Sequence, residues 1–130
     1  MGDTGDAETS VGGRGCLLGS VAIRRSIGHA VVMLFACAMV IELHIPDTAS
    51  LKAKRAVIKH LVETGKSRFG VAAAEVGHHQ QWQRSELGFA SVAGAPGHVE
   101  DVLDSVERFV WSHPEVTVLR CERSWLDTEG

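Results

Sequence analysis

The chain has 130 residues, of which 45% are hydrophobic and 22% are charged, and its net charge is −3. These values are typical of one soluble globular domain with a modest core. Its three cysteines are odd in number and lack CxxC spacing, which excludes a disulfide framework and a cysteine-based zinc site and favours a reducing, cytoplasmic setting.

Residues 1–30 differ in character from the rest of the chain. Gly, Asp, Ser and Thr dominate residues 1–20, so we expect 1–30 to be a disordered or non-native N-terminal extension. Arg24 and Arg25 precede an apolar run and together imitate a targeting signal. That run covers about 15 residues, fewer than the roughly 20 that a membrane span needs. We therefore expect no membrane segment.

The first well-patterned segment, residues 31–45, is apolar and ends in alternation, which predicts a central strand. Pro46 ends it, and Asp47 or Ser50 can cap the helix that follows. The inward face of this helix is predicted to consist of four apolar residues: Leu51, Ile58, Leu61 and Val62. Lys54 falls inside this apolar arc, and Gly65 is a plausible residue to end the helix.

The remaining segments alternate strands with one clear helix. Strands are predicted at 69–76, 85–93 and 115–125, and a helix at 99–110, where apolar residues recur at spacings of three and four. A polar connection, residues 77–84, separates the second and third strands. Residues 128–130 form a tail after a domain that spans residues 31–127.

The order strand, helix, strand, strand, helix, strand predicts an α+β protein of the ferredoxin-like βαββαβ class. Its four-stranded antiparallel sheet carries both helices on one face, and right-handed crossovers place the first and third strands in the centre. The other face stays open. It lacks the aromatic pair that an RNA-recognition motif stacks on bases, but it could pair with a second copy of the chain.

A basic segment stands out in this acidic protein. Residues 45–68 carry six basic and two acidic side chains, a net charge of +4, whereas residues 69–130 carry −6. The candidate phosphate-binding residues are Lys52, Lys54, Arg55, Lys59, Lys66 and Arg68. The alternative is that they form an ordinary solvated helix face. If the helix ends at Gly65, Lys66 and Arg68 belong to the following loop.

The polar connection adds candidates for contact with a base or a partner protein. These are Trp82, Arg84 and His78; Trp82 could instead cover a sheet edge. A weaker hypothesis is a metal-dependent activity around His44, Glu75, His78 and His79. No catalytic constellation, phosphate-binding glycine loop or cofactor motif is evident, so we expect a protein that is not an enzyme and holds no metal or cofactor.

Several stretches together resemble the YlxP-like family, small bacterial proteins of unknown function that are sometimes labelled ribosome-binding-factor-A-like. They are residues 41–46 (IELHIP), 50–55 (SLKAKR), 74–78 (AEVGH), 82–84 (WQR), 98–100 (HVE) and 109–110 (FV). The similarity covers about residues 31–127 and implies a ferredoxin-like fold. Residues 1–30 have no counterpart in the family, and Gly65 stands where a longer helix-forming residue is expected.

These observations lead to two functional hypotheses. The first is an accessory protein that binds RNA or the small ribosomal subunit during translation or ribosome maturation, an association that the resemblance implies through gene neighbourhood. The second is a homodimer or other homo-oligomer that uses the open sheet face to bind a protein or a ligand.

Overall fold

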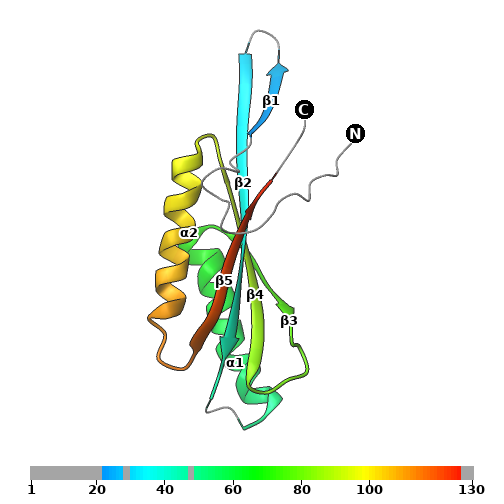
Figure 1. Cartoon of the computed structure of the whole chain (residues 1–130), viewed down its shortest axis with the longest axis vertical. Coiled ribbons are helices and arrows are strands. Elements are labelled where there is room, and N and C mark those ends of the chain that lie inside the picture. The colour runs from blue at the N-terminus through cyan, green and yellow to red at the C-terminus, as the bar shows by residue number, and fades with distance from the viewer. Residues whose placement is uncertain (1–21, 28–29, 47–48, 127–130) are drawn as a thin grey trace.

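A computed structural model describes residues 22–27, 30–46 and 49–126 (Figure 1). The elements along the chain are β1 (Ala22–Ile27), β2 (Ala30–His44), α1 (Leu51–Phe69), β3 (Ala72–Gly77), β4 (Arg84–Ala93), α2 (Pro96–Trp111) and β5 (Thr117–Trp125). Neither described helix combines the length and apolar character that crossing a bilayer requires.

The strands β3, β4, β2 and β5 lie side by side in that order, and each neighbouring pair is antiparallel. From β2 onward, the chain follows the order strand, helix, strand, strand, helix, strand, and both helices lie on one side of the sheet (Figure 1). The predicted ferredoxin-like fold is therefore confirmed. β2 and β4 occupy the centre, as expected for the first and third strands of the motif.

β2 alternates between the two faces of the sheet and explains where the core lies. Its buried side chains lie beneath the helices: Cys37, Met39, Ile41 and Leu43. Ile45, just after the strand, is buried as well. Each Leu or Ile buried in this way stabilises the fold by about 1.5–3 kcal/mol. The residues between them, including Glu42 and His44, belong to the opposite face, which neither of the described helices covers. We call this second surface the open face.

Helix α1 begins after Ser50 and ends before Gly70, which lies five residues beyond the glycine at which the sequence suggested an end. Ser50 is the N-cap, and its Oγ accepts a hydrogen bond from the Ala53 N–H at 3.1 Å. The prediction that the helix ends at Gly65 is wrong, because the helix continues to Phe69 and is capped by Gly70 at a φ of 69°. Gly65 is needed for packing instead, since a Cβ there would lie 3.0 Å from Cε1 of Phe89.

The expected N-terminal extension is in part a strand. β1 pairs with the first residues of β2, from Ala22 opposite Phe35 to Ile27 opposite Ala30. Residues 22–27 thus satisfy backbone groups on an edge of β2 that β5 does not reach, whereas the prediction that residues 1–30 are a disordered or non-native extension stays a prediction. Residues 1–21 and the tail at 128–130 lie outside the described residues.

Candidate functional site

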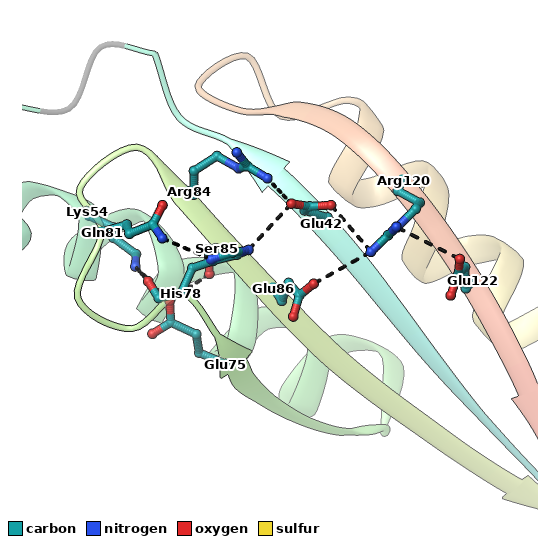
Figure 2. A network of polar contacts seen from close by, with 10 residues as sticks. All are labelled: Glu42, Lys54, Glu75, His78, Gln81, Arg84, Ser85, Glu86, Arg120 and Glu122. Atoms are coloured by element: carbon teal, nitrogen blue, oxygen red, sulfur yellow. Dashed lines mark hydrogen bonds and ion pairs between the residues drawn. The ribbon is translucent and has the colours of Figure 1, made fainter. Parts of the chain in front are cut away.

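Polar side chains from β2, α1, β3, the β3–β4 connection, β4 and β5 gather at one end of the sheet (Figure 2). They form two connected layers. One layer lies between α1 and the sheet and is centred on Lys54. The other lies on the open face and is centred on Glu42.

Lys54 is the buried centre of the first layer. Its side chain is 1% exposed, and its Nζ lies 2.9 Å from Oε2 of Glu75 and donates to the His78 carbonyl at 2.5 Å. Ser85 Oγ donates to the same Glu75 oxygen at 2.7 Å. These partners explain why a lysine occupies the apolar arc of α1. Because its ammonium is enclosed and already paired, Lys54 is poorly placed for the phosphate contact predicted from the sequence, which stays a prediction.

His78 joins the two layers. It has a φ of 60°, a left-handed conformation that costs a non-glycine residue about 1–3 kcal/mol. Lys54 holds its carbonyl, and its ring Nε2 lies 3.4 Å from Oε2 of Glu42. Gln81 Nε2 lies 3.2 Å from the other ring nitrogen. Lys54 thus fixes the backbone of the β3–β4 connection on the helix side of the sheet, while the His78 imidazole faces Glu42 on the open face.

Glu42 is the centre of the open-face layer. The Arg84 guanidinium donates to Oε2 of Glu42, and Arg120 lies 3.6 Å from Oε1 and 3.9 Å from the Glu86 carboxylate. The hydrogen bond from Arg84 is the largest influence on Glu42 and holds the pKa of its carboxyl below the ordinary value, against the opposing effect of burial. The cluster is therefore an ion-pair network with Glu42 ionised at neutral pH.

Glu42, His78 and Glu86 have a geometry that could hold a metal ion. Each offers one ligand atom, and the three atoms lie within 4.8 Å of one another. However, Arg84 and Arg120 already place two guanidinium charges on the two carboxylates. A divalent cation would have to displace them, so this donor set favours ion pairing over metal binding.

The structure groups a different set of donor residues from the one in the metal hypothesis based on the sequence. Of His44, Glu75, His78 and His79, only His78 belongs to the group of donor atoms just described. Glu75 faces Lys54 on the other side of the sheet, and the His79 ring hydrogen-bonds the Glu75 backbone carbonyl at 3.1 Å. The sequence signal for the actual cluster was the alternation that places Glu42 and Glu86 on the open face; nothing linked Arg120 to it.

The other predicted phosphate-binding residues are exposed, and four of them share one flank of α1. At 100° per residue they fall within an arc of about 60° and extend over roughly 21 Å of the helix. They are Lys52, Arg55, Lys59 and Lys66, which we call the α1 basic stripe. Lys66 joins the stripe because the helix continues through Gly65. Its contact with Glu63, 3.9 Å long between two exposed side chains, is a weak restraint.

The stripe points away from α2, whereas Arg68 does not belong to it. His60, on a different flank of α1, contacts the rings of Phe109 and His113, which locates α2 on that side. The guanidinium of Arg68 lies 5.0 Å from the ring centroid of Phe69 and 5.9 Å from that of Phe109. The predicted basic group therefore divides into a stripe, a buried lysine and one arginine near α2.

Trp82 is the most accessible of the three residues predicted to contact a base or a partner, with 52% of its surface exposed. His78 and Arg84 are both engaged by Glu42. Gln83 anchors the connection, because its side chain donates to the Pro46 carbonyl at 3.2 Å. Trp82 is therefore presented on a fixed segment near the N-terminal turn of α1, which Lys54 joins to the same connection.

Comparison with known proteins identifies similarities in the same part of the chain. The model of the DUF503 family, described as a protein of unknown function, matches residues 36–123. A protein of Bacillus subtilis (strain 168), named "Uncharacterized protein YlxP", is 37% identical over 83 residues, which cover 62% of this chain and 90% of the relative. Four stretches that carry the resemblance, residues 41–46, 50–55, 74–78 and 82–84, meet around His78.

Proposed function

The chain belongs to the DUF503 family, and we propose that it is a non-enzymatic accessory protein that binds RNA through the α1 basic stripe. The proposed target is the small ribosomal subunit, during translation or ribosome maturation. Neither the family description nor the name of the relative assigns an activity. The observation that carries the proposal is the alignment of Lys52, Arg55, Lys59 and Lys66 on one exposed flank of a single helix.

The stripe has the chemistry of a phosphate-contacting surface. Lysine and arginine side chains on a regular scaffold bind consecutive backbone phosphates and release counterions, which makes the binding salt-dependent. The net charge of the whole chain is −3, so general attraction to RNA is weak and local contacts must supply the affinity. Because the stripe is local and positive, it would also orient the protein on its target.

Trp82 supplements the stripe with a flat aromatic surface. It is exposed on the connection that Lys54 fixes to the first turn of α1. An exposed indole on a rigid segment can stack on an unpaired base, and such stacking contributes about 1–3 kcal/mol per base. We therefore assign base contact to Trp82 and phosphate contact to the stripe.

Co-sedimentation with purified small ribosomal subunits tests the proposal. We expect the full-length chain to bind at both low and near-physiological salt, and a Lys52→Gln/Arg55→Gln variant to lose binding at the higher salt. The matched control is Thr117→Glu/Leu119→Glu, which lowers the net charge by the same amount. Both positions are exposed on β5, on the other side of the central strands from β3. Equal binding by both variants would refute the role of the stripe, and binding only at low salt would indicate non-specific attraction.

The open face favours a second candidate, a homodimer formed through the sheet. Three valines on this face are substantially exposed: Val40 at 39%, Val76 at 51% and Val92 at 61%. Small residues lie among them, including Gly88 beneath Val76. A flat apolar surface of this kind is suited to isologous contact with a second copy.

Light scattering distinguishes the second candidate from the first. A dimer that Val92→Glu converts to a monomer, together with no retention on ribosomal subunits, would favour the homodimer. A monomer that binds the subunits through the stripe would favour RNA binding.

A further inference from the structure

A groove separate from the stripe lies between the last turn of α1 and one face of α2. Its volume is about 330 Å³. Arg68 and Phe69 of α1 line it, together with Ser105, Arg108 and Phe109 of α2 and Ser112, the C-cap of α2. The last four of these residues follow the spacing i, i+3, i+4 and i+7, so they lie on one face of α2 and its C-cap.

Two guanidinium groups share this groove without a carboxylate partner. Among the described residues, neither Arg68 nor Arg108 forms an ion pair. The two acids of α2 closest in sequence to Arg108 are engaged elsewhere: Asp104 and Glu107 bind Arg123 of β5 at 2.8 and 3.0 Å. The groove therefore concentrates two positive charges, offset in part by the negative ends of the two helix dipoles.

The side chains around the charges are arranged for a small polar ligand with an organic part. Arg68 lies over the Phe69 and Phe109 rings, which limits its motion and leaves its N–H edges available. Arg108 donates to Ser105 Oγ at 3.3 Å. The hydroxyls of Ser105 and Ser112 donate to carbonyls of their own helix, at 3.1 and 2.8 Å, and can rotate toward a ligand oxygen.

We propose that this groove binds a small phosphate monoester. A monoester carries a charge of about −1.5 to −2 at pH 7, which matches two guanidinium groups. A nucleic-acid phosphodiester carries one negative charge per phosphate and would leave one guanidinium uncompensated. Bidentate hydrogen bonds from arginine suit the phosphate oxygens, and the two phenylalanine rings offer an apolar surface to the rest of the molecule. This proposal does not depend on RNA binding by the stripe.

The test is a titration of the full-length protein with AMP and with inorganic phosphate, followed by amide NMR. We expect saturable shifts at residues 68–69 and 105–112, a loss of affinity of about tenfold or more in Arg68→Gln and in Arg108→Gln, and weaker binding below pH 6 as the monoester takes up a proton. Thr117→Glu changes the net charge by the same unit and should retain the parent affinity. Folding of each variant is checked from its spectrum.

Four results would overturn the proposal. The first is the absence of saturable shifts with either probe. The second is an equal loss of affinity in Arg68→Gln and Thr117→Glu, which would indicate general electrostatic attraction. The third is tighter occupation of the groove by a short RNA oligomer that has no terminal phosphate. Adenosine, which lacks the phosphate, should leave the groove resonances unchanged, and shifts equal to those with AMP would count against the proposal.

Discussion

Replacing Lys54 with methionine should destabilise the protein far more than any other substitution of a basic residue on α1. The change leaves the Glu75 carboxylate and the His78 carbonyl without the ammonium that lies 2.9 and 2.5 Å from them. Removing one member of a buried ion pair costs about 3–5 kcal/mol. Because the Glu75 side chain is 18% exposed and keeps its bond from Ser85, we expect the low end of that range.

Urea unfolding monitored by circular dichroism measures this effect directly. The control is Lys52→Met, an exposed position in the same turn, which should change the free energy of unfolding by no more than about 0.5 kcal/mol. A Lys54→Met/Glu75→Gln double variant should recover about 1.5 kcal/mol relative to the single variant, because it no longer leaves a charge unpaired. If Lys54→Met costs no more than Lys52→Met, or if the double variant recovers nothing, the buried ion pair does not stabilise the fold.

Three further predictions concern packing and titration. Gly65→Val should lower the free energy of unfolding by about 2 kcal/mol, because a Cβ would already lie 3.0 Å from the buried Phe89 ring; unchanged urea stability would contradict the close contact. Arg84→Gln should raise the pKa of the Glu42 carboxyl toward its ordinary value, as followed by NMR. In the parent, the stability that Glu42 contributes should be present above pH 4.5 and be lost as the pH falls through its depressed pKa. An acid-unfolding midpoint that is the same in the parent and in Arg84→Gln would count against this. Burial raises the pKa of the Cys121 thiol from 9.0 to about 12. Alkylation of Cys121 at pH 8, followed by mass spectrometry, should therefore be roughly a thousandfold slower in the folded chain than in the urea-unfolded chain. Similar rates in the two states would refute this prediction.

The sequence predicted the fold because the signals that determine it are local and periodic. The apolar alternation of β2, the spacing of apolar residues in α2 and the Ser50 cap each need only their own segment to be recognised. Two local features were missed because a distant contact decides them. Gly65 looks like a helix end until Phe89 is seen beside it, and residues 22–27 look unstructured until their pairing with β2 is known.

The candidate site was predicted only in part for the same reason. The helical angle of Lys54 showed that it was anomalous, but its partner Glu75 comes from another strand, and no spacing connects them. The ion-pair network of Glu42, Arg84 and Arg120 joins three strands through the register of the sheet. The groove between the helices likewise depends on how α1 and α2 pack.

The salt dependence of RNA affinity tests the proposed function most directly. The dissociation constant of a structured fragment of small-subunit RNA would be measured over a range of salt concentrations for the parent, Lys52→Gln/Arg55→Gln and Thr117→Glu/Leu119→Glu. Each lost phosphate contact should reduce the slope of log affinity against log salt by about 0.7–0.9. RNA binding through the stripe predicts a slope shallower by about 1.4–1.8 in the first variant and unchanged in the second. Equal slopes in all three proteins would contradict it.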